Sequence, residues 1–317
     1  MRALLGALLL LGACGARAEA YPWHPIRYIV ASAPGGIADL TARVLGPSLA
    51  RALGQPVVVE NRTSGGVAVG GEAVAKAPPD GHTLLSVTPQ LAISPLMQRK
   101  FPFEPRRDLA LIALVGIIPN VLAVSSRTPA ASLQELIELA RRNPGKLNYS
   151  STGQGTSVQL TAELFKNAAK VDIVHVPFHG SAAAINALVA GNVDMMVESA
   201  LPLLPHIRAG RVRALAVATA QRLPQLPGVP TFIESGFPGF EVNGWTGLAT
   251  TAGTPPEVVA RLEAETRSAL AGAEAGALLE KAGVTVHFMA AREFSAFFGA
   301  EMERFALAIR QSGARIE

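Results

Sequence analysis

Cysteine is almost absent from this chain of 317 residues, because Cys14 is the only one. No disulfide can therefore form within the chain, and the folded part is expected to carry no thiol chemistry. Its stability must come from a buried core. A chain of this length with 49% hydrophobic residues can bury a large core, and its length favours two domains over one.

Aromatic and charged residues are also scarce, at 5% and 16% of the chain. The formal net charge is +4, and the arginines are scattered instead of forming a basic stripe interleaved with aromatic residues. Nucleic acid is therefore not an expected partner. The mild positive charge favours an anionic solute.

Catalytic signatures are missing as well. The sequence has no G-x-S-x-G elbow and no lysine of the Walker type after a glycine loop. His175 and His179 are four residues apart, but Pro177 lies between them, so they do not share a helix face and no metal site is expected. We predict that the protein is not an enzyme and has no cofactor. An exported α/β hydrolase-like enzyme is the alternative.

Residues 1–20 resemble a secretory signal peptide, with an arginine near the start, a leucine-rich run and small residues after it. The run is too short to span a bilayer. Cleavage after residue 20 would leave a mature chain that begins at Tyr21. In the alternative reading, residues 11–14 form a lipobox and Cys14 carries a lipid anchor. Both readings predict export from the cytoplasm.

Strand and helix patterns alternate along the mature chain. The first part reads βαβαβ, which predicts a parallel sheet covered by helices. The same order recurs after the middle of the chain, and a Pro- and Gly-rich connection at 223–239 follows it. Strands are expected at 26–33, 56–60, 83–87, 121–124, 147–151, 173–176, 193–197 and 245–250, and helices at 38–53, 67–77, 133–142, 157–168, 182–190, 255–270 and 291–311, with only helices after residue 250.

Two glycine-bearing turns connect a strand to a helix, one in each half. They read ASAPGGIAD at 31–39 and SSTGQGTS at 150–157. In an open parallel sheet such turns lie at the carboxyl ends of the strands, where ligands bind. Helix N-termini offer free N–H groups and partial positive charge, so either turn can hold a carboxylate without Arg or Lys. The alternative is that the glycines only permit tight turns.

Nine stretches, which cover nearly the whole mature chain in order, resemble the Bug or TctC-like family, the substrate-binding receptors of tripartite tricarboxylate transporters. They include YPWHPIRYIVASAPGGIADLTARVL at 21–45, PPDGHTLL at 78–85 and GWTGLATTAGTP at 244–255. The resemblance implies an α/β periplasmic binding protein of the type II, Venus flytrap kind, with a parallel or mixed sheet in each domain and a central cleft. Domain 1 would comprise 21–122 and 238–317, and domain 2 would comprise 123–237.

The resemblance also implies a ligand site in which backbone amides of the two glycine loops hold a carboxylate. Asp39, at the first turn of a helix, is expected to cap and orient its loop. The positions carried over are Ser32, Ala33, Gly36, Ile37, Ala38 and Asp39 in the first loop, Ser151, Thr152, Gly153, Thr156 and Ser157 in the second, Ser86 and Gln90 after the third strand, and His175, Phe178 and Glu198 facing the cleft.

Three departures from the family pattern leave the ligand open. Residues 63–67 read TSGGV where Pro-Gly-Ala-Gly-Gly is usual, and Phe178 and His179 replace Tyr and Lys. Glu198 stands where Asp is common, and its charge would disfavour a second ligand carboxylate unless water or a ligand donor lies between them.

The expected partners are a small organic acid and the permease subunits of a membrane transporter, with the receptor itself a monomer. Signalling to a sensor kinase is an alternative output that the sequence does not separate from transport.

Overall fold

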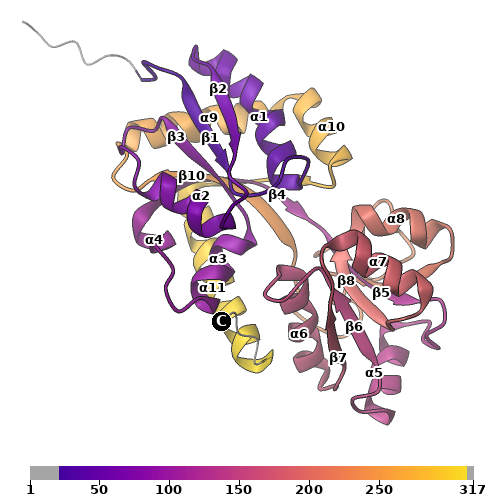
Figure 1. The fold of residues 1–317 in the computed structure, drawn as a ribbon. Coiled ribbons are helices and arrows are strands. Elements are labelled where there is room, and N and C mark those ends of the chain that lie inside the picture. Colours follow the sequence, from indigo (N-terminus) through magenta and orange to yellow (C-terminus); the bar gives the residue numbers. More distant parts are fainter. Residues whose placement is uncertain (1–20, 313–317) are drawn as a thin grey trace, which may run out of the picture.

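The computed structural model describes residues 21–312, which form two α/β units (Figure 1). The first unit combines the beginning and the end of the chain, drawn in indigo and in orange to yellow, and the second uses the middle. The expected signal peptide and Cys14 lie outside the described residues. Among the described helices, none combines the length and the apolar character that crossing a membrane requires.

The sheet of the first unit has six strands within residues 21–312, in the order β11-β4-β10-β3-β1-β2. Its parallel part consists of β1 (Ile26–Val30), β2 (Val57–Asn61) and β3 (Thr83–Val87). β10 (Gly244–Thr251) runs antiparallel between β3 and β4 (Leu109–Ile118). The sheet is therefore mixed, because the chain returns from the second unit in the opposite direction.

Helices cover both faces of this sheet. One face packs against α1 (Ile37–Leu53), α9 (Pro256–Ala271) and α10 (Ala273–Lys281). The other face packs against α2 (Gly66–Ala75), α3 (Pro89–Met97) and α11 (Ala291–Ser312), while the short α4 (Pro105–Asp108) leads into β4. Two-sided cover explains why β1 and β3 read as apolar runs.

The second unit has a five-stranded sheet within the described chain, in the order β7-β6-β8-β5-β9. Helices α5 and α6 cover one face, and α7 and α8 cover the other. The strands are β5 (Asn120–Ser125), β6 (Asn148–Ser151), β7 (Val174–Pro177), β8 (Met195–Ser199) and β9 (Val212–Val217); the helices are α5 (Leu133–Arg142), α6 (Ser157–Ala169), α7 (Ser181–Ala190) and α8 (Ala200–Arg208).

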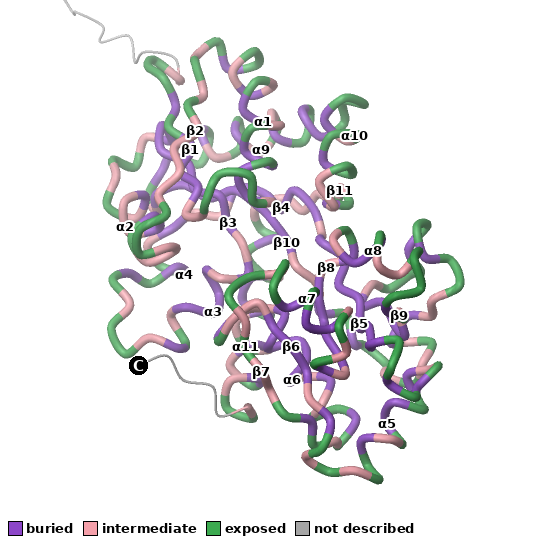
Figure 2. Tube along the Cα trace, turned by 45° about the vertical axis from the view of Figure 1, so that its right-hand side comes forward, coloured by how far each residue is buried: buried purple, intermediate pink, exposed green. Residues whose placement is uncertain are grey.

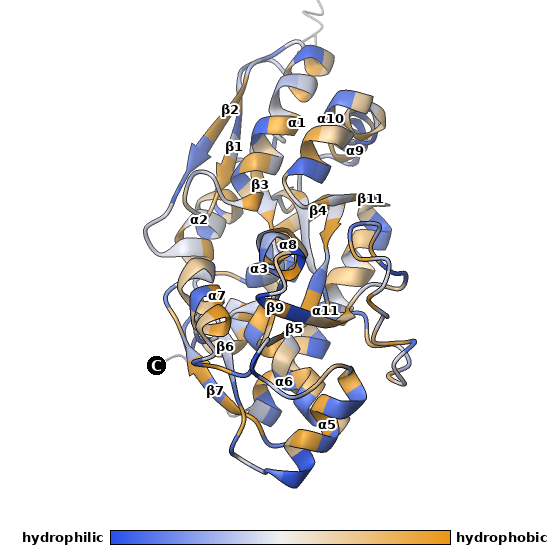
Figure 3. Cartoon of the chain, turned by 90° about the vertical axis from the view of Figure 1, so that its right-hand side faces the viewer, coloured by the Kyte–Doolittle hydropathy of each residue, from blue (hydrophilic) through white to orange (hydrophobic). Residues whose placement is uncertain are grey.

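Burial follows the strand and helix patterns of the sequence. Figure 2 shows buried residues concentrated along central strands such as β4 and β8. On α5, Leu133, Leu136, Ile137 and Ala140 are buried, so hydrophobic residues recur at helical spacing on the core side (Figure 3). The N-cap of this helix, Ser132, accepts a hydrogen bond from the backbone N–H of Glu135.

The prediction of only helices after residue 250 was wrong at β11 (Thr285–Ala290), an edge strand that pairs antiparallel with β4. Its residues, TVHFMA, are rich in β-branched and aromatic side chains, which fit an edge strand with one partner. Strand β4 was not anticipated either. The continuous apolar run LALIALVGII is compatible with a buried strand or a buried helix, and periodicity alone does not distinguish them.

The chain changes sheet at Pro119 and again between Val217 and Gly244. At these crossings the backbone N–H of Asn120 donates to Asn243 Oδ1 (3.0 Å), and Asn120 Nδ2 donates to the carbonyl of Val242 (3.0 Å). Asn243 Nδ2 in turn donates to the carbonyl of Ala218 (2.8 Å). These bonds tie the two connecting segments together. The domain limits expected at 122/123 and 237/238 stay a prediction.

We predict that Asn120→Ala lowers the free energy of unfolding by about 1–3 kcal/mol, because it leaves the carbonyl of Val242 without its side-chain donor. Asn120 is only 2% exposed, so water cannot easily replace that bond. Urea unfolding measures the change. The control is Asn186→Ala on the exposed side of α7, and equal losses in both variants would contradict the role of Asn120 at the crossing.

Candidate ligand-binding site

A cavity of about 230 Å³ lies between the two units. Its wall is built from both of them, so the relative position of the units determines its shape. The first unit contributes Ile37, Ala38, Thr88, Pro89, Ile118, Gly244, Trp245 and Thr246, and the second contributes Asn120, Thr152, Ser157, Val158, Glu198 and Ser199.

Three helix N-termini contribute to this wall. Ile37 begins α1, Pro89 begins α3 and Ser157 begins α6, and each helix follows the carboxyl end of a strand. Within the described residues, none of the three N-caps makes a side-chain hydrogen bond to its helix. The N-termini of three helices, with their partial positive charge, therefore lie at one cavity. Pro89 has no backbone N–H, so the first residues of α1 and α6 supply the N–H groups there.

The first glycine loop is held by Asp39, which is only 2% exposed. Asp39 Oδ2 accepts a hydrogen bond from the backbone N–H of Gly35 (2.9 Å), and Oδ1 accepts one from Asn61 Nδ2 (2.9 Å). Arg43 Nε lies 3.0 Å from Oδ2. Burial alone would raise the pKa of Asp39, but the hydrogen bonds from Arg43, Gly35 and Asn61 hold it below its usual value. Asp39 therefore holds the loop before α1 in place, and its part in a ligand site stays a prediction.

The other first-loop positions divide between the cavity wall and the loop itself. Ile37 and Ala38 line the cavity, but Ser32, Ala33 and Gly36 do not. The carbonyl of Ser32 accepts a bond from Asn61 Nδ2 (3.2 Å), and the N–H of Gly36 donates to the carbonyl of Ala33 (3.4 Å). These three residues shape the turn before α1.

The second glycine loop is connected to α6 and β7 through hydrogen bonds. Gln159 Oε1 accepts from the N–H of Gly155 (2.6 Å), and Gln159 Nε2 lies 3.2 Å from His175 Nδ1. His175 Nε2 lies 2.7 Å from Ser151 Oγ, which donates to the carbonyl of Gly153 (3.1 Å). An amide Nε2 can only donate, so His175 accepts at Nδ1 and donates from Nε2 to Ser151. His175 thus supports the loop and does not line the cavity.

Ser151 and His175 resemble a nucleophile and its base in distance alone. Ser151 is fully buried, and the residue that orients His175 is the neutral Gln159 where an acyl-transfer triad has an acid. Burial lowers the pKa of His175 more than Glu163 raises it, and Lys166 lowers it slightly further, so the neutral form is favoured. Ser151 is also not part of the cavity wall, so its hydroxyl does not face a molecule bound there.

The remaining second-loop positions lie around the start of α6. Thr152 and Ser157 line the cavity. Thr156 is the N-cap of α6, and its hydroxyl donates to the carbonyl of Gly153 (2.8 Å). Gly153 has a φ of 142°, a conformation that favours glycine. Thr156 and Gly153 therefore shape the loop that presents Thr152 and Ser157.

Three further expected positions lie near the cavity without lining it. Gln90 Nε2 reaches across the units to the carbonyl of Gly155, at 3.5 Å. Ser86 is buried on β3 close to the hydroxyl of Tyr28. Phe178 packs, half-buried, against the core between the sheet of the second unit and helices α7 and α8. Of the three, Gln90 is the one that bridges both units.

Glu198 lines the cavity and is only 5% exposed. Burial raises the pKa of its carboxyl group, while hydrogen bonds from Ser199 and Ser181 act in the opposite direction. The structure therefore brings together five of the expected positions in the cavity wall. They are Ile37, Ala38, Thr152, Ser157 and Glu198.

Nine wall residues were not named as site positions, although two of them lie in the stretch from Ser86 to Gln90 that was expected to follow the third strand toward the cleft. Thr88 and Pro89 had a usable signal, since a Thr-Pro pair after a predicted strand is typical of a helix start. The other seven lie where the chain crosses between the units or next to an expected position. Only the tertiary structure brings them together in the cavity wall. They are Ile118, Asn120, Val158, Ser199, Gly244, Trp245 and Thr246.

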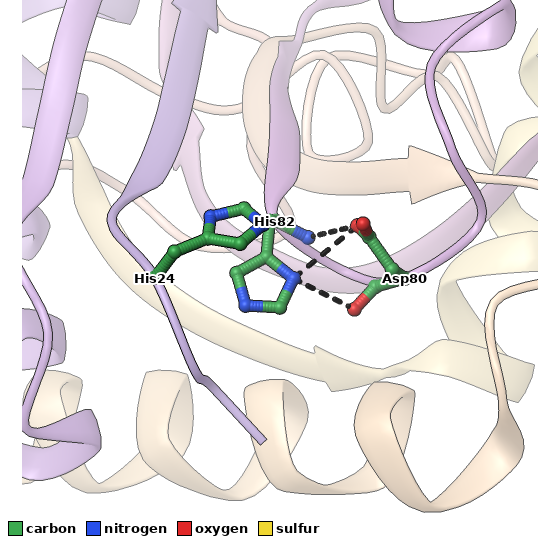
Figure 4. A group of neighbouring side chains, drawn as sticks. All are labelled: His24, Asp80 and His82. Atoms are coloured by element: carbon green, nitrogen blue, oxygen red, sulfur yellow. Dashed lines mark hydrogen bonds and ion pairs between the residues drawn. The ribbon is translucent and has the colours of Figure 1, made fainter. Parts of the chain in front are cut away.

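His24, Asp80 and His82 form a separate cluster with metal-ligating side chains in the described chain (Figure 4). His82 Nδ1 lies 3.1 Å from the carbonyl of Asp80, and His82 Nε2 accepts from the N–H of Trp23 (3.3 Å). Both ring nitrogens are therefore engaged in hydrogen bonds. The cluster precedes β1 and β3, at the opposite edge from the cavity, and it joins the starts of these strands.

We predict that the second loop loses its support as the pH falls through the pKa of His175, which lies below the ordinary 6.5. A depressed histidine pKa stabilises the fold fully above the ordinary value, and that contribution disappears when the folded form takes up the proton. A protonated Nδ1 would face the NH₂ group of Gln159 as a second donor.

Melting temperature measured from pH 8 to pH 5 tests this. His175→Gln should show a smaller decrease over that range than the unaltered protein, with His206→Gln on α8 as the control. Identical profiles for His175→Gln and the unaltered protein would contradict the prediction.

Two α/β units with a ligand-sized cavity between them define the class of periplasmic binding proteins. The model of the tripartite tricarboxylate transporter family receptor matches residues 41–314, and the chain belongs to this family. The resemblance noted in the sequence is thereby confirmed.

Relatives and solved structures agree with the family model. The chain is 39% identical over 308 residues to the UPF0065 protein in the tcbD-tcbE intergenic region of a Pseudomonas species, covering 96% of this chain and 92% of that one. A TctC solute-binding protein from Polaromonas, solved without ligand, has a TM-score of 0.82 at 25% identity, covering 92% and 99% of the two chains. An R. palustris protein solved with adipate has a TM-score of 0.78 at 30% identity, covering 93% and 100%.

Proposed function

We propose that this protein captures a small organic acid in the cavity between its units and delivers it to a tripartite tricarboxylate-type membrane transporter. The observation that carries the proposal is the meeting of the N-termini of α1, α3 and α6 at one cavity. Among the wall residues in the described chain there is no Lys or Arg, so these helix N-termini are the site's source of positive charge.

The cavity wall also contains a free donor. Thr246 is fully buried, and its hydroxyl has no hydrogen-bond partner within residues 21–312. A buried hydroxyl without a partner is costly unless a ligand or water occupies its position. Thr246 therefore supplements the backbone donors from the side of β10.

Binding by two units couples capture to domain closure. α1 and α3 belong to the first unit and α6 to the second, so one carboxylate can contact both only when the units approach each other. A ligand shifts that equilibrium only by its additional contacts in the closed form. The liganded, closed receptor then differs in shape from the empty one, which allows a permease to distinguish them.

Relatives support the ligand class and the location. One structural neighbour of 30% identity carries adipate, and a malate-bound protein from Rhodopseudomonas palustris shares 31% identity. The family consists of transporter receptors, and the neighbours are periplasmic. For this chain we propose a periplasmic location on this basis, together with export through residues 1–20 and a monomeric state.

A panel of organic acids in a thermal-shift assay, followed by calorimetry, tests the proposal. At least one carboxylate should raise the melting temperature, and Gly36→Val should abolish that shift by placing a branched side chain at the N-cap of α1. An added Cβ at Gly36 approaches the carbonyl of Ala33 only to 3.4 Å, so folding should persist. The control is Gly228→Val on an exposed connection with open space around it.

A panel in which sugars or nucleotides stabilise the protein and no carboxylate does would refute the proposal. Equal binding by Gly36→Val and Gly228→Val would show that the first loop is not part of the ligand site.

We predict opposite effects of Thr246→Val on stability and on binding. Valine keeps the shape of threonine and removes an unpaired buried hydroxyl, so the free energy of unfolding should stay the same or rise by up to about 1 kcal/mol. Affinity for the captured acid should fall about two- to tenfold, the value of one hydrogen bond. Calorimetry and urea unfolding on the same preparation check both effects. Lower stability with unchanged affinity would show that the hydroxyl serves the fold.

A further inference from the structure

We propose that Glu198 makes this receptor selective for monocarboxylates, that is, for acids whose other end carries no charge. This inference rests on the proposed capture of a carboxylate. The carboxylate of Glu198 occupies the hydrogen-bond donors that a second ligand carboxylate would need in the second unit. Glu198 lies at the carboxyl end of β8 and is part of the cavity wall.

Both oxygens of Glu198 are already hydrogen-bonded by the protein. Oε1 accepts from the backbone N–H of Ser199 (2.8 Å) and from Ser199 Oγ (2.9 Å). Oε2 accepts from Ser181 Oγ (2.9 Å). Three donors on one carboxylate resemble the coordination that a bound anion receives.

These donors stand at the starts of two helices. Ser181 is the first residue of α7, and Ser199 is the N-cap of α8. The partial positive charges of both N-termini therefore act on the Glu198 carboxylate. This part of the second unit is an anion site that a side chain of the protein fills.

A second carboxylate on the ligand would meet an unfavourable environment here. The three donors favour the ionised form of Glu198, in opposition to burial, which raises its pKa. A second carboxylate would share the cavity with that charge, and the wall residues of the described chain include no Lys or Arg to offset the repulsion. The side chains of Ile37, Ile118, Val158 and Trp245 supply apolar wall. An uncharged ligand end can contact this wall, and a charged one would lose its hydration there.

The cavity, at about 230 Å³, has room for a small acid. Short aliphatic acids fit such a volume, which makes pairs of equal chain length suitable probes. Hexanoate and adipate differ in one terminal carboxylate, and so do butyrate and succinate.

The experiment measures affinity for both pairs by calorimetry, with the full mature chain and with Glu198→Gln. In the unaltered protein, the monocarboxylate of at least one pair should bind about tenfold tighter than its dicarboxylate partner. Glu198→Gln keeps the side-chain shape and removes the charge, so it should reduce this preference to about threefold or less. The matched control is Glu72→Gln on α2, whose carboxylate pairs with Lys76 away from the cavity; it should retain the preference.

Two outcomes would overturn the inference while leaving acid capture intact. One is that, in both pairs, the dicarboxylate binds the unaltered protein at least as tightly as its monocarboxylate partner. The other is a preference that Glu198→Gln leaves unchanged. The first comparison needs no variant, so it remains decisive if Glu198→Gln does not fold. If no acid from either pair or from the wider panel binds the unaltered protein, the proposed function itself fails and the inference fails with it.

Discussion

The constraint on which this structure depends is the cost of holding an anion away from water without a cationic side chain beside it. Helix N-termini meet that constraint, because their first N–H groups have no partner within the helix. Parallel strands followed by helices bring such N-termini to one edge of a sheet, and β1, β3 and β6 do this for α1, α3 and α6. The order of the strands therefore also determines where the partial positive charges of these helix N-termini lie.

The same physics governs the carboxylates of the protein itself. Asp39 accepts hydrogen bonds from the backbone of its own loop and from Asn61, and Glu198 accepts from the start of α8 and from α7. Their pKa values move in opposite directions. At Asp39 the bonds from Arg43, Gly35 and Asn61 outweigh burial, whereas burial dominates at Glu198, which has no cationic partner in the described chain. The side-chain carboxyl group beside the cavity thus has a raised pKa, whereas the one that fixes the first loop has a lowered pKa.

Strands and helices with a local pattern could be predicted from the sequence, and contacts across the units could not. The turns at 31–39 and 150–157 could be recognised as glycine loops between a strand and a helix. The place of Asp39 in the first turn of its helix indicated that it orients the loop. His175 was expected to face the cleft, but its ring supports the second loop through Gln159 and Ser151. Its direction depends on residues from α6 and β6, which no spacing in the sequence relates to it. The wall residues of β4 and β10 were missed for the same reason.

The crossing between the units joins the fold to the binding site. Asn120 belongs to the cavity wall and also makes the hydrogen bonds that tie β5 to the segment before β10. Trp245, two residues beyond Asn243, forms another part of the wall, and its Nε1 donates to the buried Glu301 on α11 (2.9 Å). A change in the angle between the units therefore moves wall residues that a ligand would contact. Because the connecting segments and the cavity share residues, a molecule bound in the cavity would contact the segments that join the two units.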